Sequence, residues 1–136
     1  MNHCARVLAA RSAPLAEAYC DQLRQASSGM AARLRERRPV EALEAFERAL
    51  APMQKMLVFA FVSESLLRDA QHPLRPDLEA FSSSLCAALT RIEEAIVDRD
   101  FEAMLVALET AMIPTLERYP TLGPRLTSAL SPRLAA

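Results

Sequence analysis

The chain has 136 residues, with 16 basic and 17 acidic side chains, so its formal net charge is −1. This length fits one domain, and 51% hydrophobic with 24% charged residues is a globular balance. With 2 glycines and 5% aromatic residues, strand-rich and hairpin-rich folds are nearly excluded. A near-neutral charge gives no general attraction to nucleic acid or to an anionic membrane.

The cysteines and the apolar runs bear on where the protein resides. Cys4, Cys20 and Cys86 are too few and too scattered for a disulfide framework, and their spacings fit no zinc motif. The longest uninterrupted apolar run, residues 56–62, is about a third of the roughly 20 residues that a membrane helix needs. The N-terminal residues lack the long apolar run of a secretory signal. We therefore expect a soluble, cytoplasmic protein with reduced thiols and no membrane contact.

The first predicted helix begins at Ser12 or Pro14 and ends before Pro39, because proline suits a first turn and the residue before a proline avoids the helical region. Its apolar side chains recur at alternating intervals of three and four residues, which places them on one helical face. They are Leu15, Tyr19, Leu23, Ala26, Met30 and Leu34. Gly29 is a point where this helix can break.

The second predicted helix follows so closely that it must run antiparallel to the first. Its apolar stripe stays in phase across Pro52, so we expect that proline to kink the helix rather than end it. The stripe consists of Leu43, Phe46, Leu50, Met53, Leu57 and Phe61.

A loop over residues 69–75 precedes two further helices, which are separated by a tight turn at residues 98–100 where an aspartate can cap the next helix. Their stripes are Leu78, Phe81, Leu85, Leu89, Ile92 and Ile96, and then Phe101, Leu105, Leu108, Met112, Leu116 and Tyr119. Pro114 is expected to kink the fourth helix. Residues 120–136 contain three further prolines and form a tail, in which Leu122, Leu126 and Leu130 can make one short docking helix.

These patterns predict an all-α fold, an antiparallel up-down four-helix bundle with a short C-terminal helical tail. Residues 1–136 form a single domain whose core spans about residues 14–119. The stripes supply roughly 20 core side chains, each contributing about 1.5–3 kcal/mol on burial, which is a core large enough for a chain of this length.

Catalytic and metal-binding patterns are missing from the sequence. A di-metal bundle needs Glu-x-x-His pairs; Asp69 and His72 have the right offset but lie in the predicted loop. A glycine-rich phosphate loop cannot be built from Gly29 and Gly123 alone, and no serine has nucleophile-elbow neighbours. We therefore predict a protein that is not an enzyme, with no catalytic residue, no metal site and no cofactor.

Four arginines cluster at the end of the first predicted helix: Arg33, Arg35, Arg37 and Arg38. Cations near a helix C-terminus complement its dipole, and acidic residues open the next helix, so we interpret the cluster as structural. The alternative is a phosphate or RNA contact, but no aromatic side chains interleave with the arginines, and we do not expect nucleic acid as a partner.

The second predicted helix carries more apolar surface than one bundle face requires. Beside its core stripe, a second face is formed by Val58, Phe59, Val62 and Leu66. A helix that is apolar all round must be covered by something. The cover is either the N-terminal segment with the C-terminal tail, or a second copy in a homodimer, or a helix of a partner protein.

We therefore expect a small protein-interaction module, an adaptor or a chaperone-like protein that binds a helical segment of a partner. The partner is either another protein or a second copy in a homodimer. The residues expected to make the contact are Val58, Phe59, Val62 and Leu66. Its size and helicity resemble those of small export chaperones such as those serving flagellar or type III secretion, a likeness at the level of the fold. The alternative is a ligand-binding or enzymatic bundle with an internal apolar pocket, whose polar lining would come from Tyr19, Tyr119, Cys20 or Cys86.

Overall fold

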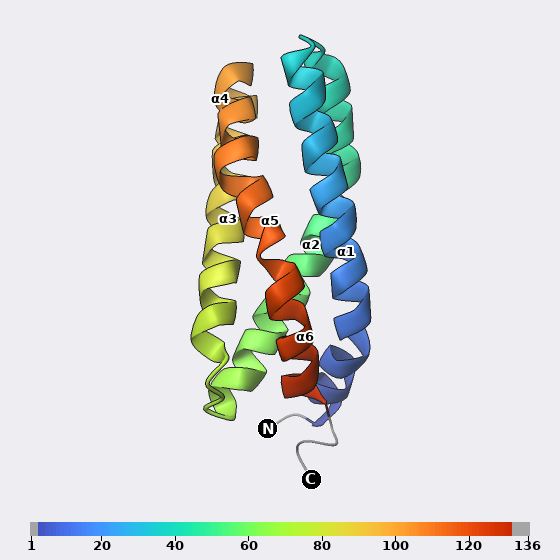
Figure 1. Cartoon of the computed structure of the whole chain (residues 1–136), viewed down its shortest axis with the longest axis vertical. Coiled ribbons are helices and arrows are strands. Elements are labelled where there is room, and N and C mark those ends of the chain that lie inside the picture. Colours follow the sequence, from blue (N-terminus) through green and yellow to red (C-terminus); the bar gives the residue numbers. More distant parts are fainter. Residues whose placement is uncertain (1–2, 132–136) are drawn as a thin grey trace.

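The computed structural model describes residues 3–131, and every regular element among them is a helix, which confirms the all-α class. The helices form four successive arms, which can be followed in Figure 1. They are α1 His3–Arg35, α2 Pro39–Asp69, α3 Arg75–Val97, and a fourth arm made of α4 Phe101–Ala107, the π-helical η1 Leu108–Met112, α5 Ile113–Glu117 and α6 Tyr119–Leu130. Successive arms run in alternating directions in Figure 1, which is compatible with an up-down bundle.

Helix α1 begins at His3 rather than at Ser12 or Pro14, and Pro14 lies inside it. The core therefore extends N-terminal of residue 14. Its buried face advances in steps of four and three residues, as expected for a helical stripe, but consists mainly of small side chains. They are Ala9, Ala13, Ala16, Cys20, Leu23, Ser27 and Met30. The predicted stripe member Leu15 is exposed, and Gly29 does not break the helix.

Helix α2 opens with Pro39 in its first turn and continues without interruption past Pro52. Figure 1 shows its direction changing near the middle, where it stops following α1 and crosses towards α3, as expected for a proline that removes one backbone hydrogen bond. Phe61, predicted to face the core, is 51% exposed. The buried face is instead Ala42, Ala49, Met53, Met56, Phe59, Ala60, Ser63, Leu66 and Leu67.

The fourth arm starts where Asp100 accepts a hydrogen bond of 3.0 Å from the backbone N–H of Ala103, which confirms the predicted aspartate cap. The π-helical turn η1 directly precedes Pro114, which lies in the first turn of α5. Proline cannot donate to the carbonyl one turn back and collides with it in a regular α-helix. The widened turn separates these groups, so the arm passes Pro114 without ending.

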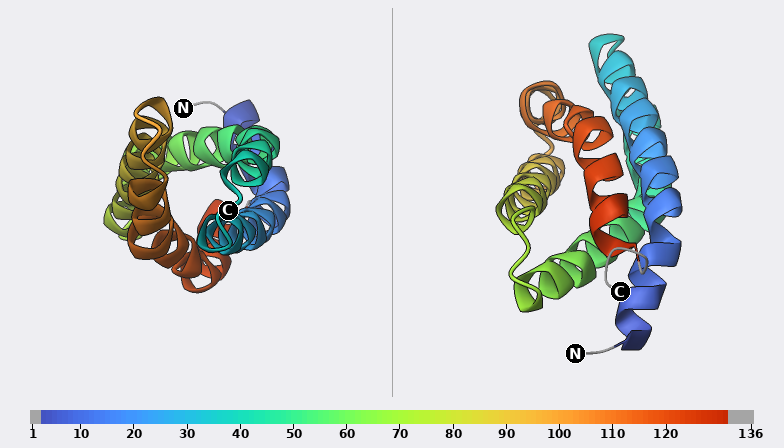
Figure 2. Two further views of the ribbon diagram at one scale, coloured as in Figure 1. Left: turned by 90° about the horizontal axis from the view of Figure 1, so that it is seen from above. Right: turned by 60° about the horizontal axis from the view of Figure 1, so that its bottom comes forward.

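The predicted docking helix is confirmed as α6, in which Leu122, Leu126 and Leu130 are buried. It lies beside α1 (Figures 1 and 2). Arg125 also pairs with Asp77 on α3 at 3.2 Å. Residues 132–136 of the expected tail fall outside the described part of the chain.

Candidate functional site: an apolar groove between α1 and α2

A groove of about 510 Å³ runs along the outer surface between the first half of α1 and the second half of α2. It is lined by Ala5, Leu8, Ala9, Ser12, Leu15, Ala16, Tyr19, Gln54, Lys55, Val58, Phe59 and Val62. The ammonium group of Lys55 lies 5.5 Å from the centroid of the Tyr19 ring, a cation–π contact that fixes how the two helices are aligned.

The walls of the groove are large apolar side chains that face solvent. Leu8 is 63% exposed and Leu15 is 53% exposed on α1, while Val58 and Val62 are 61% and 36% exposed on α2. Its floor is formed by Ala9, Ala16 and Phe59, which are buried. Single exposed apolar residues are ordinary on a protein surface, whereas a large contiguous patch of them is typical of contact sites, which makes this groove the candidate site.

Of the four residues predicted to form a second apolar face on α2, two are exposed and two are buried. Val58 and Val62 are exposed on the groove wall, but Phe59 and Leu66 are each only 7% exposed. Phe59 forms part of the floor, and Leu66 belongs to the core.

Leu8 and Leu15 were missed as site residues in the sequence. Their seven-residue spacing was a usable signal, because it repeats on the same helical face. It was hidden because Leu15 was assigned to the core stripe, while the true core stripe of small residues went unseen. The N-terminal segment thus covers part of the apolar face of α2 and adds apolar surface of its own. The C-terminal helix α6 packs against α1 and α3 instead.

Charged side chains lie in and beside the groove: Lys55 lines it, whereas Asp69 and Arg11 lie outside its lining. Lys55 and Asp69 are both exposed on the same side of α2, and neither forms an ion pair with another residue in the described part of the chain. On α1, Arg11 lies between Leu8 and Leu15 at helical spacings of three and four residues, so it neighbours both of them on the helix surface.

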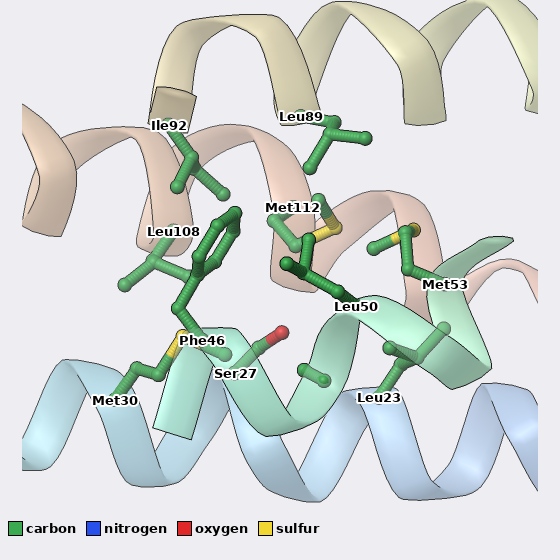
Figure 3. Close-up of a pocket in the computed structure, with 11 residues that line it drawn as sticks. Leu23, Ser27, Met30, Phe46, Leu50, Met53, Leu89, Ile92, Leu108 and Met112 are labelled. Carbon is green, nitrogen blue, oxygen red and sulfur yellow. The ribbon is translucent and has the colours of Figure 1, made fainter. Parts of the chain in front are cut away.

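The bundle interior contains a much smaller cavity, of about 10 Å³ (Figure 3). Phe46, Leu108 and Ile92 converge on it in Figure 3 from three different arms, and Ser27 supplies its one polar side chain. This volume holds about one water molecule. The cavity lining includes none of the polar residues expected for an internal ligand pocket, which were Tyr19, Tyr119, Cys20 and Cys86.

Cys20 is the most deeply buried of the three cysteines, and its thiol donates a hydrogen bond of 3.5 Å to the carbonyl of Leu116. Burial raises the pKa of this thiol to about 12. Burial also raises the pKa of Tyr119. A protonated thiol is a poor nucleophile, so Cys20 ties α1 to α5 and is not activated for chemistry at neutral pH.

The other sequence candidates have structural roles. His72 accepts a hydrogen bond of 3.0 Å at Nδ1 from the backbone N–H of Leu74, which holds the turn before α3. Within residues 3–131, no group of three or more His, Cys, Asp or Glu side chains could hold a metal ion. In the arginine cluster, Arg33 and Arg38 pair with Glu41 at 3.7 and 3.6 Å, and Arg35 pairs with Glu109. These pairs favour the structural interpretation of the cluster.

Helix α2 is, by length and composition alone, long and apolar enough to cross a membrane, and 39% of its most apolar window is buried in the bundle. Core helices of soluble proteins meet the same criterion, so this finding does not distinguish a membrane location from a soluble one. Comparison of the chain with protein-family models, curated proteins and solved structures finds no match. Any functional inference therefore rests on the groove itself.

Proposed function

We propose that this protein is a cytoplasmic protein-interaction module, an antiparallel up-down four-helix bundle that binds an α-helical segment in the groove between α1 and α2. The observation that carries the proposal is the convergence of Leu8, Leu15, Val58 and Val62, all exposed, on one continuous groove. An amphipathic helix buries its apolar stripe in such a groove.

The spacing of the wall residues supports a helix as the ligand. Leu8 and Leu15 are seven residues apart on α1, and Val58 and Val62 are four apart on α2. Side chains at these intervals leave holes into which the apolar side chains of a third helix insert. An extended peptide that binds by strand addition would require an exposed strand edge, and none is present among the described residues.

The experiment uses a designed amphipathic peptide with leucines at heptad spacing and a fluorescent label, titrated with the protein. Val58→Asp places a carboxylate on the groove wall, and we expect it to weaken binding at least about tenfold, since burying an unpaired charge is strongly unfavourable.

The matched control is Val40→Asp, because Val40 is on the same helix and is 65% exposed outside the groove. The control should bind the peptide as the wild type does. Equal binding by wild type and Val58→Asp, or no binding by the wild type, would contradict the proposal.

A further inference from the structure

The outer face of α2 repeats the pattern of a coiled-coil seam. Lys55, Val58, Val62, Ser65 and Asp69 follow one another at intervals of three and four residues, and all five are exposed. A seam of this spacing packs against another helix over several turns. Its two charged members are of opposite sign and lie seven residues on either side of Val62.

We propose that the occupant of the groove is a second copy of this chain, packed about a two-fold axis that passes beside Val62. The inference rests on the proposed function, because it uses the same groove. A two-fold interface brings the same patch of both molecules together, so the patch must be complementary to itself. With α2 antiparallel to α2 of the second copy, Val62 meets its own counterpart and Lys55 meets Asp69 of the other copy at both ends.

The position of Asp69 supports the pairing of its carboxylate with a cation from a second copy. Asp69 is the last residue of α2, and the C-terminal end of a helix carries partial negative charge that disfavours a carboxylate. Its neighbour Arg68 is engaged with Glu64 at 2.9 Å. Lys55 of a second copy would supply the missing positive charge, and the cation–π contact leaves its ammonium group free to donate hydrogen bonds to a carboxylate.

The size of the face bears on whether the dimer is permanent or transient. The seam spans about 21 Å of helix, and two helices side by side are about 20 Å wide, so each copy offers roughly 400 Å². The interface then totals roughly 800 Å², below the range of permanent dimers. We therefore expect a weak dimer that forms and dissociates reversibly.

The test is sedimentation equilibrium of the full chain over micromolar to millimolar concentrations. Wild-type protein should show a reversible monomer–dimer equilibrium. Lys55→Asp places two carboxylates together at each end of the interface, and Asp69→Lys places two ammonium groups together. Each variant alone should dimerise about tenfold more weakly.

An equimolar mixture of these two variants should recover wild-type association. In the heterodimer, the two carboxylates on the seam of the Lys55→Asp chain face the two ammonium groups on the seam of the Asp69→Lys chain, so opposite charges meet at both ends. The double variant K55D/D69K should recover association as well. Two exposed α3 charges away from the groove serve as controls. Arg91→Asp and Glu93→Lys should leave dimerisation unchanged, and circular dichroism checks that every variant stays helical.

The outcomes separate this inference from the proposed function. A wild-type chain that remains monomeric at millimolar concentration overturns the second copy as occupant, while binding of the designed peptide by that monomer leaves the proposed function standing. If the peptide does not bind either, both fail. A dimer in which the charge variants associate like wild type, or in which their mixture does not recover, overturns the antiparallel pairing about Val62.

Discussion

Gly123 on α6 lies against the ring of Tyr119, so close that a β-carbon at Gly123 would be 3.0 Å from Cε2 of the tyrosine. The Tyr119 ring cannot move aside easily, because it is buried and its centroid lies 5.2 Å from that of Phe81. The glycine leaves room for this ring, which comes from one turn earlier on the same helix, and for Glu17 of α1, whose Oε1 would be 3.2 Å from the β-carbon. It does so although glycine lowers the intrinsic stability of the helix.

We therefore predict that Gly123→Ala lowers the free energy of unfolding by about 1–2 kcal/mol, because overpacking outweighs the gain in helix propensity. Gly29→Ala is the matched comparison. Its β-carbon would have only the flexible end of Arg33 nearby, at 3.5 Å, so it should raise the free energy of unfolding by about 1 kcal/mol. Urea denaturation measures both, and equal stabilisation by the two substitutions would contradict the packing described for α6.

Phe59 and Val58 are neighbours in sequence but lie in different environments. Phe59→Ala should cost about 3–5 kcal/mol, as expected for a buried aromatic side chain. Val58→Ala should change the free energy of unfolding by less than about 0.5 kcal/mol, because Val58 faces solvent. Thermal and urea unfolding of both variants decide this point. A large loss for Val58→Ala would place that valine in the core and remove the groove wall.

The hydroxyl of Ser63 is fully buried on α2 and has no hydrogen-bond partner in the described structure. An unsatisfied hydroxyl in an apolar core is unfavourable. Ser63→Ala should therefore raise the free energy of unfolding by about 1 kcal/mol, measured by urea denaturation. A loss of similar size would show that the hydroxyl has a partner in solution.

Stability should also fall at alkaline pH. Burial raises the pKa of Cys20 from 9.0 to about 12, so between these values the unfolded chain loses a proton that the folded chain keeps. The contribution is fully present below pH 9.0 and is lost as the pH rises towards 12. The slope of the free energy of unfolding is then negative, by as much as about 1.4 kcal/mol per pH unit for one group.

The comparison for this prediction is Cys20→Ala, which should make the alkaline loss shallower. Some slope will remain, because burial also raises the pKa of Cys86 and of Tyr119. Urea titrations at a series of pH values measure both proteins. Parallel curves for wild type and Cys20→Ala would mean that this thiol ionises equally in the folded and unfolded chains.

The sequence predicted the all-helical class, the turn capped by Asp100 and the docking of α6, because large apolar stripes and capping residues are local signals. It placed the start of α1 wrongly, since Pro14 looked like a first-turn proline and the core face there consists of alanines. Alanine is a strong helix former but a weak marker of burial.

Only part of the groove lining could be expected from the sequence, for the same reason. A surplus of apolar residues on α2 was visible, and Val58 and Val62 are indeed exposed. Which part of that surplus stays uncovered depends on how the other helices pack against α2, and Phe59 and Leu66 are buried. Leu8 could only be recognised as a wall residue once α1 and α2 were aligned through Tyr19 and Lys55.

The most direct measurement of the central claim is methyl NMR of the leucine and valine side chains during titration with the designed amphipathic peptide. Binding in the groove predicts shifts at Leu8, Leu15, Val58 and Val62, with the exposed Val40 and Val97 elsewhere on the bundle unchanged. Shifts centred on Val97, or a spectrum that the peptide leaves unaltered, would contradict a helix-binding groove between α1 and α2.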